Sequence, residues 1–100
     1  MSTPTPTPTL NIRDLQRIFA TTWHERHLKV DLIIDTLYLY HVQGYTQKQA
    51  ALELGVSSGR VGQVLRRGER MLRWYYRRMS DADKAKIRAY PSMRARLVCP

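Results

Sequence analysis

The sequence predicts an all-α fold: a small helical domain of four to five helices that contains a helix-turn-helix. Two observations carry this prediction. Apolar residues recur three and four positions apart along most of the chain, which is the spacing of one helix face. Small polar residues precede these runs, where their side chains can accept the free backbone N–H groups of a first helical turn. No segment alternates apolar and polar residues between turn signals, so no strand is predicted.

Two helices are expected ahead of the middle of the chain. Asn11, followed by Asp14, resembles a helix start, and apolar residues at helical spacing follow as far as Trp23. A second helix is expected over 29–43, with an apolar face wide enough for a central helix that is covered on more than one side. Gly44 ends it.

A short helix, a turn and a long helix are expected next. Thr46 with Gln49 is a capping box, and Gly55 stops the short helix that follows. Ser57 then caps a helix that is expected to continue as far as Met79.

A last helix and a tail complete the chain. Ser80 with Asp83 opens this helix, and Pro91 ends it because proline disfavours helical geometry in the residue before it. We therefore divide the chain into a disordered Thr-Pro arm, one folded domain and a basic C-terminal tail, over residues 1–9, 10–90 and 91–100.

The composition indicates a cytoplasmic protein without a membrane segment. One hundred residues suffice for one small domain. Asp31 and Asp35 interrupt the most apolar stretch well before the ~18 apolar residues that a membrane span needs. The Met-Ser-Thr-Pro start matches neither a secretory signal nor a transit sequence, and the single cysteine, Cys99, cannot form an internal disulfide.

Positive charge is concentrated in the second half. Seventeen Lys and Arg against eight Asp and Glu give a net charge of +9, and residues 51–100 hold twelve of the basic side chains and four of the acidic ones. Such an excess favours a polyanionic partner, most often nucleic acid and sometimes an anionic membrane surface. Arginine outnumbers lysine, and its guanidinium binds phosphates and guanine edges through two hydrogen bonds.

The segment 44–73, GYTQKQAALELGVSSGRVGQVLRRGERMLR, meets the physical requirements of a helix-turn-helix, with the motif at 46–73. The turn needs a positive backbone angle, which Gly55 adopts readily. Ala51 is small where the two helices cross closely. The space between the helices is expected to be filled by apolar side chains, namely Leu54, Val56, Val61 and Val64.

The long helix has an apolar face and an opposite polar face when its residues are placed at 100° intervals. A recognition helix in the major groove reads bases from its first turns and meets phosphates beyond them. Base-reading roles are therefore predicted for Ser57, Ser58, Arg60 and Gln63. Phosphate contacts are predicted for Thr46, Gln47, Lys48, Arg66, Arg67 and Arg70. The alternative is an arginine-rich, solvated face on a helical bundle.

Three glycines inside this helix need a reason, since each costs ~1 kcal/mol relative to alanine. Gly59 and Gly62 lie toward the outer face, where a missing side chain lets the backbone approach DNA closely. Gly68 lies on the inner face, where it permits tight helix packing.

The stretch QGYTQKQAALELGVSSGRVGQVLRRGERMLR resembles region 4 of the sigma-70 family, the helix-turn-helix of bacterial initiation factors that contacts the −35 promoter element. The resemblance covers about residues 30–73. In that family an Arg-Glu pair and a later glutamine commonly read bases. Gln63 matches the glutamine, whereas Ser58 and Gly59 stand where the pair would be.

The stretch SSGRVGQVLRR is also similar to small plasmid repressors of the KorA type, again including Gln63. Both resemblances imply double-stranded DNA as the partner. The first adds RNA polymerase, and the second adds a homodimer formed through a C-terminal part.

An aromatic–basic cluster follows the motif, formed by Arg73, Trp74, Tyr75, Tyr76, Arg77 and Arg78. Three interpretations remain open. The aromatic rings pack under the last helix, form a dimer contact through Trp74 and Tyr75, or stack on nucleic acid or a membrane interface.

No catalytic or metal site is predicted. His24 and His27 lie three residues apart, but neither His41 nor Cys99 completes a four-ligand set. The chain has no Gly-rich phosphate loop and no Gly-x-Ser-x-Gly turn. Asp31 and Asp35 lie one helical turn apart on the second helix, and a solvated or Arg-paired face explains them. We expect neither an enzyme nor a cofactor.

The sequence thus predicts a sequence-specific transcription regulator that binds double-stranded DNA, a homodimeric repressor of phage, plasmid or bacterial origin. It would act in the cytoplasm of a bacterial or phage-infected cell. The alternative is a sigma-like interaction factor that binds RNA polymerase or another regulator.

Overall fold

The computed structural model describes residues 9–22 and 30–98, which form helices and no strands. The helices are α1 (Ile12–Thr22), α2 (Val30–Leu37), α3 (Gln47–Leu54), α4 (Ser58–Tyr76), α5 (Asp81–Arg88) and α6 (Pro91–Met93), with π-helical segments η1 (Tyr38–Val42) and η2 (Arg94–Val98). The predicted all-α class is confirmed. Trp23, His24, His27, Cys99 and the Thr-Pro residues before Thr9 lie outside the described residues.

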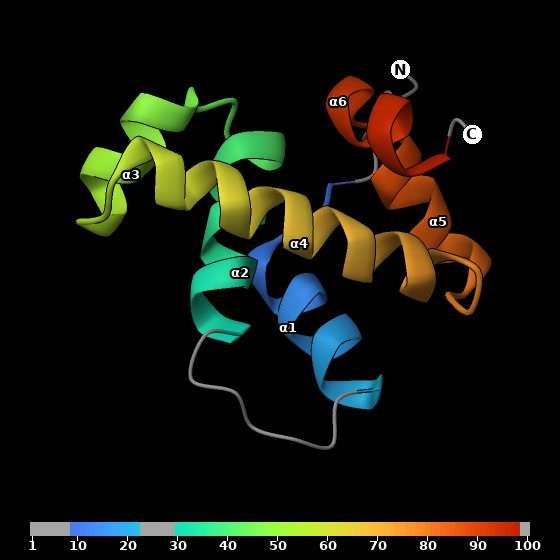
Figure 1. Cartoon of the computed structure of the whole chain (residues 1–100). Helices are drawn as coiled ribbons and strands as arrows, with labels where there is room; N and C mark the ends of the chain where they lie inside the picture. Colours follow the sequence, from blue (N-terminus) through green and yellow to red (C-terminus); the bar gives the residue numbers. More distant parts are fainter. Residues whose placement is uncertain (1–8, 23–29, 99–100) are drawn as a thin grey trace.

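The long helix α4 is the axis of the fold. It packs against α2, against α3 and against η2. Figure 1 shows α1 and α2 below α4, α3 beside its N-terminal end, and α5 and α6 toward its other end. None of the described helices is long and apolar enough to cross a membrane.

Helices α2 and α4 cross closely because Gly68 has no side chain. A Cβ atom on Gly68 would lie 2.8 Å from Cγ2 of Ile33 and 3.1 Å from Cδ1 of Leu37. Leu37 is fully buried, as are Leu65 and Leu72 on the α4 side of the crossing. The predicted role of Gly68 in tight helix packing is therefore confirmed.

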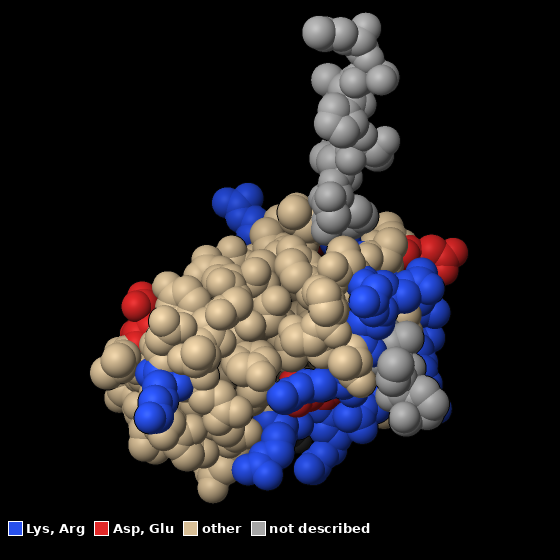
Figure 2. All heavy atoms as spheres, turned by 90° about the horizontal axis from the view of Figure 1, so that it is seen from above, with Lys and Arg blue, Asp and Glu red and all other residues tan. Residues whose placement is uncertain are grey.

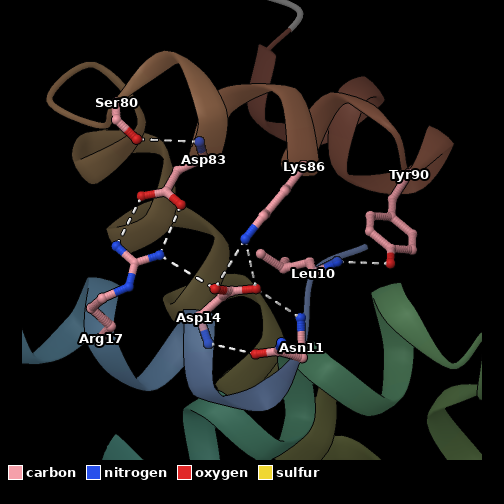
Figure 3. A network of polar contacts seen from close by, with 8 residues as sticks. All are labelled: Leu10, Asn11, Asp14, Arg17, Ser80, Asp83, Lys86 and Tyr90. Atoms are coloured by element: carbon pink, nitrogen blue, oxygen red, sulfur yellow. Dashed lines mark hydrogen bonds and ion pairs between the residues drawn. The ribbon is translucent and has the colours of Figure 1, made fainter. Parts of the chain in front are cut away.

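A network of ion pairs joins α1 to α5 (Figure 3). Asn11 and Asp14 exchange side-chain and backbone hydrogen bonds, which confirms the predicted helix start. Lys86 Nζ lies 3.2 Å from both carboxylate oxygens of Asp14, and Arg17 bridges Asp14 to Asp83, with 2.8 Å to Asp83 Oδ1. The first and last helices of the expected domain are thus held together by charge as well as by packing.

The C-terminal segment differs from the expected tail. Pro91 does not end the domain but occupies the first turn of α6, where the missing N–H of proline has no helical partner to lose. Met93 and Leu97 are buried in the same core as α1, α2 and α4. Residues 91–98 are therefore part of the folded domain, because their apolar side chains complete its core.

Candidate nucleic-acid interface

The helix-turn-helix forms as its local sequence predicts. Thr46 caps α3, with its Oγ1 accepting from the Gln49 N–H at 3.1 Å and its own N–H donating to Gln49 Oε1 at 2.9 Å. Gly55 ends α3 with φ of +69°, a left-handed conformation that glycine adopts without a Cβ clash. Ser57 Oγ accepts from the Arg60 N–H at 3.1 Å and so caps α4.

A small apolar cluster fixes α3 against α4. Ala50, Ala51 and Val61 are buried in it, and Leu39, Tyr45 and Val56 pack around them. Val64, which we expected here, instead joins the main core. Small side chains thus lie where the two helices of the motif cross, as predicted for Ala51.

The outward face of α4 is polar and basic along its whole length. Exposed residues on this helix include Gln63, Arg66, Arg67, Arg70 and Arg73, and the exposed Arg77 directly follows its last turn. Basic side chains gather along the border of Figure 2 that corresponds to the front of Figure 1, where α4 lies. The predicted division of α4 into an apolar and a basic face is therefore confirmed.

Three of the four predicted base-reading residues lie on the first two turns of α4, and the fourth, Ser57, is its N-cap. Ser58 and Gln63 are exposed, and Arg60 is half-buried. Arg60 and Gln63 line one small cavity together with Arg67. The hydroxyl oxygen of Ser57 is engaged in the helix cap, so Ser57 presents less hydrogen-bonding capacity to a base than Ser58 does.

The start of α3 lies beside the first turns of α4. Gln47 and Lys48 are exposed there, and a Cβ atom on Gly62 would lie 3.2 Å from Gln47 Oε1. No described residue lies within 4 Å of the corresponding position at Gly59. The predicted phosphate-contacting residues of α3 and the predicted reading turns of α4 therefore belong to one surface.

The only carboxylate of α4, Glu69, points away from this surface. It is buried, accepts from His41 Nε2 at 2.7 Å, and pairs with Arg96 Nη1 at 3.1 Å. Burial alone would raise the pKa of Glu69, but the bonds to His41 and Arg96 lower it below its usual value. The outward face of α4 consequently carries no acidic side chain.

Sequence reasoning missed this buried network. His41 Nδ1 also lies 2.7 Å from the Ser92 hydroxyl oxygen, so η1, α4 and α6 meet at one histidine. The available signal was that Glu69 falls between apolar residues on the inner face of its helix. Buried carboxylates need a partner, and the histidine and arginine that supply it are distant in sequence.

The aromatic cluster divides between core and surface. Tyr75 is buried, and its ring meets Phe19 edge-on with centroids 5.2 Å apart. Our expectation that Tyr75 takes part in a dimer contact is therefore wrong, because its side chain fills the core. Trp74 does not pack under the last helix: it is 52% exposed and carries the Arg78 guanidinium 3.8 Å above its ring.

Over the described ranges, no three His, Cys, Asp or Glu side chains are grouped so as to hold a metal ion. His24, His27 and Cys99 are not among those ranges.

Comparison with known proteins gives one match. Residues 35–73 match the family model Sigma-70, region 4, a helix-turn-helix DNA-binding region rather than an enzyme family. The matched span covers the end of α2, η1, α3 and most of α4. No curated protein and no solved structure matches the chain significantly. The resemblance to Sigma-70, region 4 is thus confirmed for residues 35–73, the part of the chain that contains the helix-turn-helix.

Proposed function

We propose that this protein is a sequence-specific transcription regulator that places the first turns of α4 in the major groove of double-stranded DNA. The observation that carries the proposal is the face of α4. It presents a glutamine and then a run of arginines, with its only carboxylate turned into the core. A helix of this kind reads base edges with its first turns and neutralises phosphates with the rest.

The proposed roles follow from exposure and position. Gln63 would pair with adenine through two hydrogen bonds, and Arg60 with guanine, while Ser58 would accept or donate at either. Ser57 would contribute mainly by holding the helix start. Phosphate contacts are proposed for the exposed residues of α3 and α4 named above, namely Thr46, Gln47, Lys48, Arg66, Arg67 and Arg70.

A repressor acting as a homodimer in the bacterial cytoplasm remains our proposal for the biological role. The surface around Trp74 is a poor homodimer contact, because a twofold axis there would oppose the arginines of two copies. A dimer would therefore use another face. Binding to RNA polymerase is the second candidate, supported by Ser58 and Gly59 standing where the matched family commonly carries its Arg-Glu pair.

Binding-site selection from random duplex DNA at ~0.15 M salt tests the proposal, because weak unspecific contacts are screened there. We expect an enriched sequence. A palindrome with half-sites about one helical turn apart indicates a dimer, and a single asymmetric site indicates a monomer beside polymerase. No enrichment in spite of a net charge of +9 would reject base reading by α4.

Substitution at Gln63 distinguishes base recognition from electrostatic contacts to the phosphates. Gln63→Ala is expected to relax the preference at one base position and to cost ~1–3 kcal/mol on the selected site. Arg66→Ala, one turn further along the same face, is expected to weaken binding to all sequences alike. Competition binding with single-base variants of the selected site measures both. A uniform loss in Gln63→Ala would show that Gln63 reads no base.

A further inference from the structure

The C-terminal half of α4 and the turn that follows it carry a second basic feature, outside the residues assigned to base reading. Arg70, Arg73, Trp74, Arg77 and Arg78 line a shallow hollow in the surface. None of the described residues that line it is a carboxylate. Four guanidinium groups therefore surround one half-exposed indole ring.

Two of these guanidiniums are held in place by the protein itself. Arg78 stacks on the Trp74 ring and donates from Nη1 to the Trp74 carbonyl oxygen at 3.2 Å. Arg73 donates from Nη2 to the Arg96 carbonyl oxygen at 3.1 Å. Such anchored side chains lose less conformational freedom on binding than free ones do, which favours a preformed anion site.

The remaining cations of the hollow have no intramolecular counterion. Within the part of the chain that the structure describes, neither Arg70 nor Arg77 forms an ion pair. The buried carboxylates lie elsewhere: Asp14 and Asp83 join α1 to α5, and Glu69 is paired with Arg96. Clustered cations without counterions repel one another and attract a partner of opposite charge.

The position of the hollow on α4 points to the DNA backbone. Arg73 and Arg77 lie ten and fourteen residues beyond Gln63, which places them ~15 Å and ~21 Å further along the helix axis. The major groove is ~12 Å wide. A straight helix that enters the groove with its first turns has left it at this distance, and phosphates border the groove there.

The same geometry disfavours stacking of a base on Trp74. One face of the indole is covered by Arg78, and the Tyr75 ring meets it at 75° with centroids 5.5 Å apart. The indole therefore serves to hold Arg78 rather than to receive a nucleobase.

We propose that Arg73, Arg77 and Arg78, arranged around Trp74, form a second phosphate-binding site that grips the backbone of the same duplex beyond the groove read by α4. This inference rests on the proposed function. The site adds affinity and orientation without adding sequence preference.

The test compares the full chain with the double variant Arg73→Ala/Arg77→Ala by fluorescence anisotropy on duplexes that carry the selected site, over a range of salt concentrations. The matched control is Arg13→Ala/Arg88→Ala, which removes two exposed arginines of α1 and α5 that also form no ion pair in the described structure. Each lost phosphate contact is expected to reduce the slope of log K against log salt by ~0.9, so the double variant reduces it by about 2.

Four further readouts sharpen the comparison. The double variant keeps the base preference of the wild type. The single variant Arg77→Lys, which keeps the positive charge, retains most of the wild-type slope of log K against log salt. Duplexes are also shortened on one side of the selected site or on the other. For the wild type, only one of these two truncations lowers the salt slope. For the double variant, that truncation no longer changes the slope. Because Arg73 bonds to the chain, Arg77→Ala alone is included, with a slope expected to fall by about 1.

The outcomes separate the two proposals. A slope that falls no further in the double variant than in the control overturns the phosphate site, and an acidic protein surface then becomes the partner of the hollow. A wild-type protein that selects no sequence, but whose slope the double variant still lowers, overturns base reading and supports the phosphate site. Absence of duplex binding by the wild type overturns both.

Discussion

Two glycines of one helix show how single residues divide between stability and function. A Cβ atom at Gly68 would press against Ile33 and Leu37, while none of the residues that the structure describes lies within 4 Å of the same position at Gly59. Both glycines carry the same intrinsic cost in a helix. Packing therefore explains Gly68, whereas no contact in the described part of the chain explains Gly59, for which we propose close approach of DNA.

Alanine at these two positions is expected to act in opposite directions. Gly68→Ala gains up to ~1 kcal/mol of helix propensity but overpacks the α2–α4 crossing by ~1–3 kcal/mol, so the free energy of unfolding falls. Gly59→Ala raises it by up to ~1 kcal/mol and weakens DNA binding. Urea unfolding measures the free energy of unfolding of both variants, and fluorescence anisotropy measures the DNA binding of Gly59→Ala. Stabilisation by Gly68→Ala would mean that the two helices have room to separate.

At the scale of elements, the folded structure lowers the pKa of the two carboxyl groups that join α1 to α5 and raises the pKa of one on α2. The hydrogen bond from Arg17 lowers the pKa of Asp83 despite the burial of the carboxyl group. For Asp14, burial raises the pKa, but its bonds to Asn11, Lys86 and Arg17 outweigh this and lower it. Burial, together with repulsion from Asp31, raises the pKa of Asp35 on α2. The contact between α1 and α5 thus stabilises the charged forms of Asp14 and Asp83. The surroundings of Asp35 on α2 destabilise its charged form.

These directions predict how stability depends on pH. A carboxyl group with a lowered pKa in the folded state stabilises the fold above the unfolded-state pKa, near 3.8 for Asp, and this contribution is lost as the pH falls through the folded value. Asp83→Asn is therefore expected to lower the midpoint of thermal unfolding by a few degrees at pH 7, with the difference from wild type vanishing in acid.

Asp35→Asn provides the control of opposite sign. Because the folded-state pKa of Asp35 is raised, its ionisation costs stability as the pH rises above 3.8, and the variant should be more stable than wild type at pH 7. Thermal melts at pH values between 3 and 7 follow both variants. A parallel change in the two variants would show that net charge, and not the local environments, governs the pH dependence.

At the scale of the whole molecule, the C-terminal segment closes the domain that contains the helix-turn-helix. Met93 and Leu97 are buried in the main core, and Arg96 pairs with Glu69 of α4. The segment therefore supports α4 through Glu69 and Arg73, which bond to the Arg96 side chain and to its carbonyl oxygen. Without it, Glu69 would lose a partner and part of the core would face water.

Removing the apolar side chains of this segment should destabilise the entire fold. Met93→Ala/Leu97→Ala is expected to lower the free energy of unfolding by at least about 3 kcal/mol, since each buried side chain of this size contributes ~1.5–3 kcal/mol. Arg94→Ala, exposed in the same segment, is expected to change it by less than ~0.5 kcal/mol. Urea unfolding compares the two. Equal effects would indicate a tail that adds nothing to the core.

The sequence by itself determined what depends on neighbours within a helical turn. The caps at Thr46, Ser57 and Ser80 formed as expected, Gly55 took the positive φ of the turn, and α4 divided into an apolar and a basic face. The same patterns predicted the helix-turn-helix, because capping and helical periodicity act over three to four residues. The resemblance of the quoted stretch to Sigma-70, region 4 was confirmed for residues 35–73.

Only the tertiary structure decided what depends on contacts between distant residues. His41 and Arg96 both bond to Glu69, and Tyr75 enters the core while its neighbour Trp74 stays exposed. Pro91 begins a helix at the position where a basic tail was expected to start. Local patterns show which residues can be buried or charged, but the choice of partner belongs to the packing of helices far apart in the sequence.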